Sequence, residues 1–130
     1  MLKVLEGELF KKRKTDAGYD ITSDQDIVIY PRQSELISTG LRIELPANHV
    51  GILKSRSGLS TKYQLEVGAG VLDEGYTGEV KVHLYNLSDI HYQVKAGDRI
   101  AQLLVLPVNT DFVCGDGSER GSDGFGSSGT

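Results

Sequence analysis

Residues 68 to 86 combine a lone carboxylate, a tyrosine and several glycines in an order that could bind and cleave a small molecule. Asp73 ends an apolar stretch, and Tyr76 lies between two glycine-containing turns. Because apolar and polar side chains alternate over residues 80–85, the segment predicts a β-hairpin. Glycines in its first strand indicate the close approach of another backbone or of a ligand. Such a hairpin could read one edge of a flat heterocycle, although an ordinary surface hairpin explains the same pattern.

Two further segments carry groups that bind anions. In the first, Arg56, Ser57 and Gly58 offer a guanidinium, a hydroxyl and an accessible N–H at the start of a helical turn. The alternative is that Ser57 only caps a short helix. In the second, Arg120 and Phe125 lie among glycines and serines, so an aromatic ring could stack on a base beside an anion. Its alternative is a disordered tail, and the histidines have no metal-ligand spacing.

Length and composition narrow the class of protein. The chain has 130 residues, which is enough for one domain with a modest core. A formal net charge of -4 gives no general attraction to nucleic acid or to anionic membranes, so we expect neither as a partner. No apolar run reaches the roughly 18 residues of a membrane span, and we expect a cytoplasmic protein, in the host cytoplasm if the gene is viral. A single cysteine, Cys114, excludes an intrachain disulfide.

Short strands bounded by turns are expected over most of the chain. The patterns predict strands at residues 26–30, 35–37, 40–45, 50–53 and 99–108, and a helix of no more than about a turn and a half at 58–63. Many short strands with almost no helical periodicity predict an all-β barrel or jelly roll. From residue 115 onward the composition cannot bury a core. We therefore expect a folded domain over residues 1–114 and a flexible tail over residues 115–130.

Taken together, these segments resemble the trimeric dUTP pyrophosphatase (dUTPase) family over nearly the whole chain, from Ala17 to Gly129. Five motifs occur in the family's order, and such a series is far more specific than any one of them. They are Ala17-Gly18-Tyr19-Asp20-Ile21; Arg56-Ser57-Gly58-Leu59; Gly68-Ala69-Gly70-Val71-Leu72-Asp73-Glu74-Gly75-Tyr76-Thr77-Gly78; Gly97-Asp98-Arg99-Ile100-Ala101-Gln102-Leu103; and Arg120-Gly121 with Gly124-Phe125-Gly126-Ser127-Ser128-Gly129.

The resemblance implies a distorted jelly-roll-like subunit in a homotrimer, with each active site built from three chains. It implies hydrolysis of dUTP to dUMP and pyrophosphate with Mg2+, which limits uracil incorporation into DNA and supplies dUMP for thymidylate synthesis. Asp73 would be the base that activates water for attack at the α-phosphorus. The Mg2+ would be held mainly by the phosphates and water, with Asp20 orienting an arginine or a metal-bound water. Phosphate contacts would come from Arg56, Ser57, Gly58, Gln102 and Arg120.

The resemblance also implies how the nucleoside is bound. Tyr76 would lie beneath the deoxyribose and exclude a 2'-hydroxyl. The tail would close over the base as a lid through Phe125 and Gly126. The base contacts would leave the amino group of cytosine unpaired and no room for the methyl group of thymine. Main-chain groups would make these contacts, at Gly70, Val71, Leu72 and Lys81.

Two positions depart from the family pattern. Asp123 stands where glycine is usual and adds negative charge near a triphosphate. Ser55 stands where proline is common, and we expect this to matter little. Two other functions stay open. A related dCTP deaminase would need a glutamate at the pyrimidine, for which Glu66 and Glu79 are candidates beside Glu74, and would lack the tail motif. A capsid-like or regulatory jelly roll would bind protein, and this is compatible with a second role beside catalysis.

Overall fold

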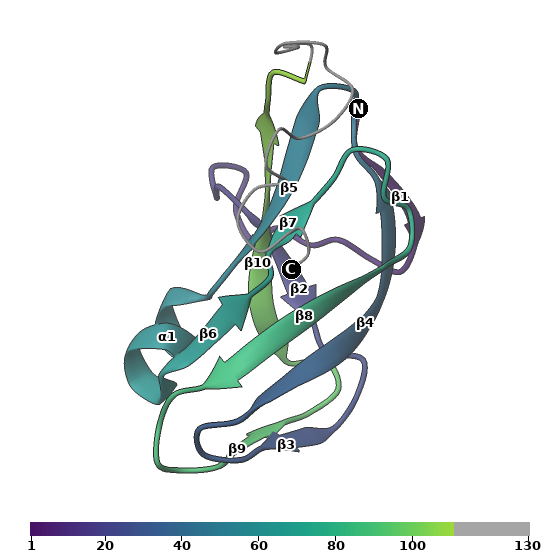
Figure 1. The fold of residues 1–130 in the computed structure, drawn as a ribbon. Coiled ribbons are helices and arrows are strands. Elements are labelled where there is room, and N and C mark those ends of the chain that lie inside the picture. Colours follow the sequence, from purple (N-terminus) through teal and green to yellow (C-terminus); the bar gives the residue numbers. More distant parts are fainter. Residues whose placement is uncertain (111–130) are drawn as a thin grey trace, which may run out of the picture.

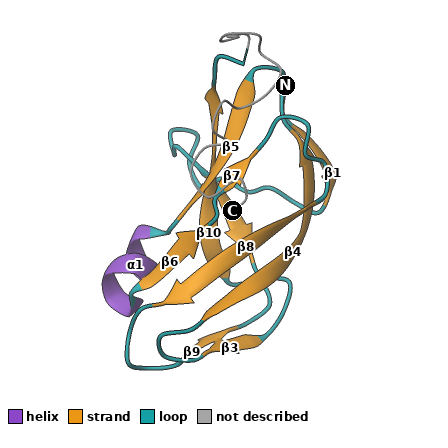
Figure 2. Cartoon of the chain, in the orientation of Figure 1, coloured by secondary structure: helices purple, strands orange, loops and turns teal. Residues whose placement is uncertain are grey.

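The computed structural model describes residues 1–110, and residues 111–130 lie outside the described part, so the expected boundary at residue 114 lies there too. Strands dominate the fold, and the all-β prediction is confirmed (Figures 1 and 2). The elements are β1 (Lys3–Glu6), β2 (Tyr19–Thr22), β3 (Ile27–Ile29), β4 (Ser34–Glu44), β5 (His49–Lys54), α1 (Ser57–Tyr63), β6 (Leu65–Gly68), β7 (Val71–Leu72), β8 (Glu79–Asn86), β9 (Tyr92–Val94) and β10 (Arg99–Pro107).

The strands form two four-stranded sheets and a small two-stranded one. Their orders are β1-β4-β8-β6, β2-β10-β5-β7 and β3-β9, and the neighbouring strands are antiparallel. The alternation noted in the sequence places Val80, Val82 and Leu84 of β8 in the core, while Lys81 and Tyr85 are exposed. Leu103 of β10 is buried as well. Both large sheets therefore contribute to one hydrophobic core.

A single long strand, β4, replaces the two strands predicted at residues 35–37 and 40–45. A bulge in its middle shifts the register of its pairing with β8. Gly40 lies in this bulge with a φ of 69°, which glycine adopts without strain. The Glu79 carboxylate accepts hydrogen bonds from the N–H groups of Thr39 (3.1 Å) and Gly40 (2.9 Å). A side chain far away in the sequence thus satisfies the bulge, and for that reason the polar Ser-Thr-Gly stretch does not end the strand.

The predicted central hairpin is correct only in its outer part. β6 and β8 pair antiparallel, with Gly68 opposite His83 at the last pair. The chain then leaves this sheet at Ala69, a non-glycine residue with a φ of 43°. β7 pairs with β5 of the other sheet, where Val71 is opposite Ile52. The two arms of the hairpin therefore separate before the turn that carries Asp73.

The helix α1 confirms the short helix expected after Ser57. Its N-cap residue is Arg56, in an extended conformation, and no side chain caps it. The alternative role of Ser57 as the capping residue is therefore wrong. At the other end, Gln64 takes the left-handed conformation and ends the helix. Within residues 1–110, no helix is long and apolar enough to cross a membrane.

Candidate active site

A polar pocket of about 220 Å³ brings together Arg56, Ser57 and Gln102, three of the residues predicted to bind phosphate, whereas Gly58 does not line it. Strand pairing explains why they meet, because Gln102 of β10 lies opposite both Asp20 of β2 and Lys54 of β5. The chain leaves β5 directly beside this point and delivers Arg56 and Ser57. The pocket is lined by Asp20, Arg56, Ser57, Gln102 and the Asp16–Gly18 loop.

Two guanidinium groups flank the carboxylate of Asp20. Its oxygens lie 3.8 Å from Nε of Arg56 and 3.6 Å from Nε of Arg99. The Asp20 side chain is only 17% exposed, whereas both arginines are more accessible. This carboxylate therefore orients Arg56 at the pocket wall, where the guanidinium is accessible to an anion.

Gln102 is held in place on both sides. Its Nε2 donates a hydrogen bond to the main-chain oxygen of Ser55 at 3.1 Å. On the other side, a Cβ at Gly18 would lie only 2.7 Å from Oε1 of Gln102. A larger residue at this position would therefore push the end of the glutamine side chain out of its present place.

A second pocket, also of about 220 Å³, opens where β7 and β8 separate. It is lined by the predicted catalytic base, Asp73, and by most of the residues predicted to contact the nucleoside. Had the β6–β8 ladder continued in register, Gly70 would face Lys81 directly; instead β7 turns away to β5. Three of the residues whose main chain is predicted to contact the base, Val71, Leu72 and Lys81, therefore border one opening. The lining residues are Val71, Leu72, Asp73, Tyr76, Glu79 and Lys81.

Tyr76 is held at the rim of this second pocket and is 46% exposed. Its hydroxyl donates a hydrogen bond to the main-chain oxygen of Glu79 at 2.6 Å. A Cβ at Gly78 would lie 2.8 Å from that hydroxyl and 2.9 Å from Cζ, so the ring can take this position only over glycine. The ring is therefore positioned before any ligand arrives.

The neighbouring carboxylates Asp73 and Glu74 differ in their contacts. Oε1 of Glu74 accepts a hydrogen bond from the N–H of Asn48 at 2.9 Å, so this side chain supports the turn before β5. Asp73 is exposed and lines the second pocket; within residues 1–110 its main-chain oxygen accepts a hydrogen bond from the N–H of Tyr76 at 3.0 Å. Of the two, Asp73 is the carboxylate that a ligand or a water in this pocket can reach.

The glycines of the hairpin have a cause within the protein. A Cβ at Gly68 would collide with the ring of Tyr85, and one at Gly70 would lie 2.5 Å from the main-chain oxygen of Leu53. The oxygen of Gly70 itself accepts the N–H of Leu53 at 2.7 Å. Close approach was expected, and the approaching groups found here belong to the chain. The carbonyl oxygen of Gly70, which was predicted to contact uracil, is therefore already bonded to Leu53 and has less capacity to bond a base.

The carboxylates of the two pockets lie at opposite edges of one sheet. Asp20 is on β2 and Asp73 directly follows β7, the two outer strands of the order β2-β10-β5-β7. Three strand spacings separate these edges, which is roughly 14 Å. As lined by described residues, the pockets have no residue in common. The predicted tail contacts Arg120, Phe125 and Gly126, and the departure at Asp123, lie outside the described residues.

Comparison with known proteins identifies the family of this chain. The dUTPase family profile matches residues 8–129. The chain belongs to the dUTPase family. It is 45% identical over 118 residues to a deoxyuridine 5'-triphosphate nucleotidohydrolase of Eremothecium gossypii, covering 87% of this chain and 77% of that protein. It is 43% identical over 124 residues to the enzyme of the same name from Saccharomyces cerevisiae, covering 92% of this chain and 84% of that protein.

Solved dUTPase structures share the fold. One is a mutant dUTPase from phage phi11 of S. aureus, described as showing the coordination of a structural Mg(II) ion. It superposes with a TM-score of 0.81 at 28% identity, covering 88% of this chain and 95% of that one. The native EIAV dUTPase gives a TM-score of 0.80 at 30% identity, with the same coverage. The jelly-roll prediction is confirmed by this likeness.

Two glutamates of this dUTPase-family chain have roles that sequence reasoning missed. Glu66 accepts hydrogen bonds from the hydroxyls of Ser55 and Ser60. The Ser60 bond, then the Ser55 bond, holds the pKa of Glu66 below its usual value, and the charge of Lys54 adds to the effect. Glu79 accepts the bulge N–H groups of β4, and the bond from Gly40 is the main cause that lowers its pKa. Both carboxylates are thus committed to the fold, which argues against either as the base of a deaminase.

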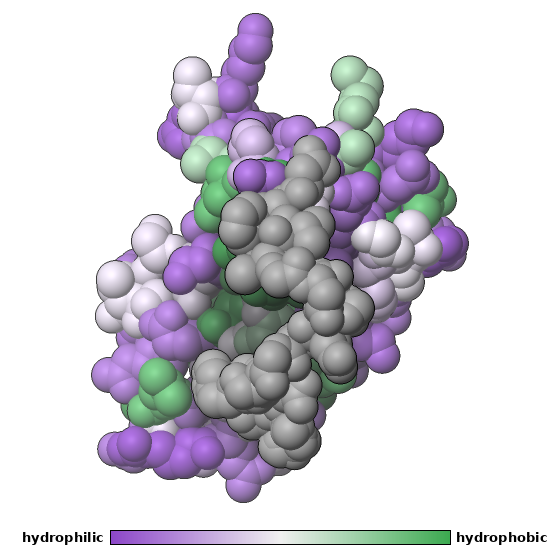
Figure 3. All heavy atoms as spheres, turned by 45° about the horizontal axis from the view of Figure 1, so that its top comes forward, coloured by the Kyte–Doolittle hydropathy of each residue, from purple (hydrophilic) through white to green (hydrophobic). Residues whose placement is uncertain are grey.

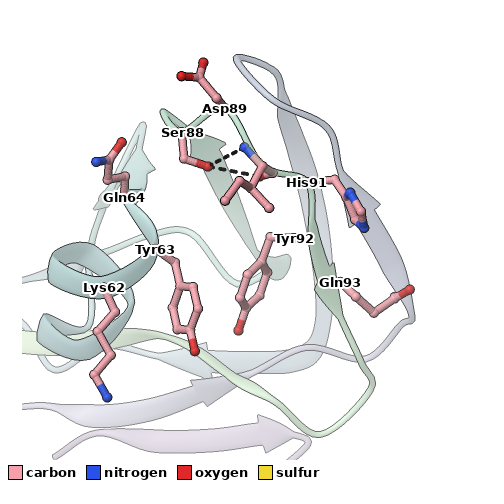
Figure 4. A pocket seen from close by; sticks show the side chains of 9 residues that line it. Lys62, Tyr63, Gln64, Ser88, Asp89, His91, Tyr92 and Gln93 are labelled. Carbon is pink, nitrogen blue, oxygen red and sulfur yellow. Dashed lines mark hydrogen bonds between the residues drawn. The ribbon is translucent and has the colours of Figure 1, made fainter.

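A third and larger pocket, of about 690 Å³, lies beside α1 and the segment between β8 and β9 (Figure 4). The rings of Tyr63 and Tyr92 stand next to each other there, with centroids 5.2 Å apart. Burial is the main cause that raises the pKa of Tyr92. No residue predicted for the site lines this pocket. Elsewhere, hydrophilic residues make up most of the face seen in Figure 3, with smaller groups of hydrophobic residues between them.

Proposed function

We propose that this chain is a dUTP diphosphatase that converts dUTP to dUMP and pyrophosphate. The observation that carries the proposal is the pair of pockets. One presents Arg56 and Gln102 to an anion, and the other presents a carboxylate beside main chain suited to a planar base. A nucleoside triphosphate has both of these parts, and membership in the dUTPase family names the base.

In this proposal Asp73 orients a water and takes its proton as the water attacks the α-phosphorus. The negative charge that develops on the phosphate oxygens is met by the guanidinium of Arg56, the hydroxyl of Ser57 and the N–H of Gly58. Gln102 and, from the tail, Arg120 add further donors. Since Arg56 is paired with Asp20 and Gln102 is bonded to Ser55 without any ligand, positioning and charge stabilisation would supply most of the rate enhancement.

Mg2+ fits this site as a partner of the substrate's phosphates. It is a hard cation that retains several waters and binds through one or two carboxylates and phosphates. Within residues 1–110 no group of three or more histidine, cysteine, aspartate or glutamate side chains gathers as a metal site. Asp20, committed to two arginines, fits the role of orienting Arg56 or a metal-bound water. When bound, the ion would neutralise charge on the triphosphate.

Base selection follows from the gap between β7 and β8. Main-chain groups of Val71, Leu72 and Lys81 would match uracil. A cytosine amino group would leave buried polar groups unpaired, which strongly disfavours reaction of dCTP. The ring of Tyr76, fixed by its hydrogen bond to Glu79, would lie against the deoxyribose and leave no space for a 2'-hydroxyl.

The two pockets would be united by assembly. Since Asp20 and Asp73 lie at opposite edges of one sheet, we propose a homotrimer in which the base pocket of one chain faces the phosphate pocket of the next. Phe125 and Gly126 of a tail, from the third chain, would close over the base, with residues 115–130 acting as a lid. The expected cytoplasmic location, the supply of dUMP and a second regulatory role stay predictions.

The proposal is tested by product analysis with four nucleotides in oxygen-18 water. We expect dUTP alone to be turned over rapidly, compared with dCTP, dTTP and UTP, and to give dUMP and pyrophosphate. The label should enter dUMP, because the water attacks the α-phosphorus. Label in pyrophosphate would place the attack at the β-phosphorus, and conversion of dCTP to a uracil nucleotide would favour a deaminase.

A further inference from the structure

Glu66 lies behind the phosphate pocket and contacts the segment that presents Arg56. It is half-buried on β6, directly after the buried Leu65. One of its carboxylate oxygens accepts the hydroxyl of Ser55 at 2.7 Å, and the other accepts the hydroxyl of Ser60. The two serines stand on either side of Arg56, Ser57 and Gly58. A single carboxylate therefore holds both ends of the proposed phosphate-binding segment.

Ser55 connects this carboxylate to the rest of the site. Its hydroxyl also accepts the N–H of Val67 at 3.0 Å, which fixes it against β6. Its main-chain oxygen accepts the side chain of Gln102 at 3.1 Å. Proline, common at this position in the family, has no hydroxyl and could make neither side-chain contact. The expectation that Ser55 matters little overlooked these bonds.

Within residues 1–110, this segment is also held by the ion pair of Arg56 with Asp20 and by the packing of Tyr63 beside Tyr92. α1 has seven residues, none of which is buried, and no side chain caps the N-terminus of the helix. A helix of this length is not stable by itself. Leu59 packs partly against the core, but Ser57 and Gly58 are exposed. Hydrogen bonds to an ionised carboxylate are the stronger kind, so the Glu66 contacts are a main restraint on this part of the chain.

We propose that Glu66, acting through Ser55 and Ser60, is a positioning residue that fixes Arg56 and Ser57 for the triphosphate of the substrate. This rests on the proposed function. An ionised carboxylate only accepts hydrogen bonds, so both serine hydroxyls must point to it. Because the pKa of Glu66 lies below its usual value, the carboxylate stays ionised at neutral pH. Loss of Glu66 should therefore weaken contacts to the phosphates and leave the base pocket, built on β7 and β8, as it is.

The test compares Glu66→Ala with Glu44→Ala. Glu44 is an exposed strand residue whose side chain makes no hydrogen bond or ion pair within residues 1–110, so it controls for removal of a glutamate. We expect Glu66→Ala to lower kcat/KM for dUTP by about 10- to 100-fold, the effect of a small misplacement of binding groups. Affinity for a non-hydrolysable dUTP analogue should fall, whereas affinity for 2'-deoxyuridine, which has no phosphate, should stay at the parental value. Glu66→Gln, which keeps the shape and can still bond both hydroxyls, should recover part of the loss.

A double variant checks the route. Ser55→Ala with Ser60→Ala should reproduce the loss, and adding both changes to Glu66→Ala should cost little more, because the three residues act as one unit. Parental turnover in Glu66→Ala, or equal weakening of the analogue and of deoxyuridine, would overturn the proposal. If the parental chain did not hydrolyse dUTP, the proposed function would fail. Amide exchange over residues 56–63 would still decide the role of Glu66, since faster exchange than in Glu44→Ala supports it and equal exchange overturns it.

Discussion

Replacing Asp73 by asparagine removes the proposed base and keeps nearly everything else. Asparagine has the same shape, and the hydrogen bond from the N–H of Tyr76 is to the main-chain oxygen, which the substitution leaves in place. The residue is exposed at the end of β7, so we expect no large change in thermal stability. Affinity for dUTP should also be retained, because the proposed phosphate and base contacts are made by other groups.

The size of the loss depends on whether another carboxylate can replace Asp73. Glu74 is next in sequence, but it is bonded to the N–H of Asn48 and supports a different turn. We therefore expect the full effect of a general base, about 100- to 10,000-fold in kcat. By transition-state arithmetic this is about 2.7 to 5.4 kcal/mol.

Single-turnover hydrolysis of dUTP, measured beside binding of a non-hydrolysable analogue, checks this prediction. Glu74→Gln is the matched control, because glutamine can still accept the Asn48 N–H, and it should retain parental turnover. If Asp73→Asn hydrolysed dUTP at a near-parental rate, Asp73 would not be the base. If Glu74→Gln lost turnover while Asp73→Asn kept it, the roles of the two carboxylates would have to be exchanged.

Three other changes test separate parts of the site. A smaller residue in place of Tyr76 should raise use of UTP more than use of dTTP, and an equal rise in competition assays would indicate general loosening of the pocket. A chain ending after Val113 should still form trimers by light scattering but lose most turnover, as expected if residues 115–130 close over the substrate; parental turnover would refute the lid. Glu79→Gln should lower the free energy of unfolding at neutral pH by about 1 to 3 kcal/mol, because a charge-assisted bond to Gly40 is weakened. Since the pKa of Glu79 is lowered in the folded state, its contribution is present above the unfolded pKa of about 4.3 and is lost as pH falls through the folded pKa. Urea unfolding from pH 7 to pH 3 should therefore show a smaller acid loss in the variant than in the parent.

The elements that the sequence predicted correctly are those that depend on neighbouring residues alone. The alternation of β8 and the short helix after Arg56 could be read directly, because burial and helix length follow from neighbouring residues. The continuity of β4 could not, since its bulge is satisfied by Glu79, about 40 residues along the chain. The crossing of β7 to the second sheet was also missed, as two strands that are adjacent in sequence were assumed to pair.

In the site, too, the residues carried by motifs were predicted, whereas contacts between distant segments were not. The order of the motifs was enough to name Arg56, Ser57 and Gln102, and strand register then brings them into one pocket with Asp20. Glu66 was considered only as a deaminase base, because a carboxylate in a strand gives no sign of the serines it will bind. Successive residues of a strand point to opposite faces of the sheet, so Glu66 points away from the core that buries Leu65. This alternation was the signal that the sequence offered for Glu66. The serine hydroxyls that meet it could be located only from the fold.

Mixed trimers of two inactive variants test directly whether the site is divided between chains. Asp73→Asn should lack the base, and Arg56→Ala should lack the phosphate contact, so each homotrimer should be nearly inactive. In trimers assembled at random from equal amounts of both, about one quarter of the sites would combine an intact Asp73 from one chain with an intact Arg56 from the next. The two chains would carry different affinity tags, and trimers retained by both tags would be assayed for dUTP hydrolysis. A trimer that contains both variants has one such site among its three, so recovery to about one third of the parental rate per site is the result we expect from the doubly tagged trimers. Mixed trimers no more active than the two separate homotrimers would contradict a site shared between chains.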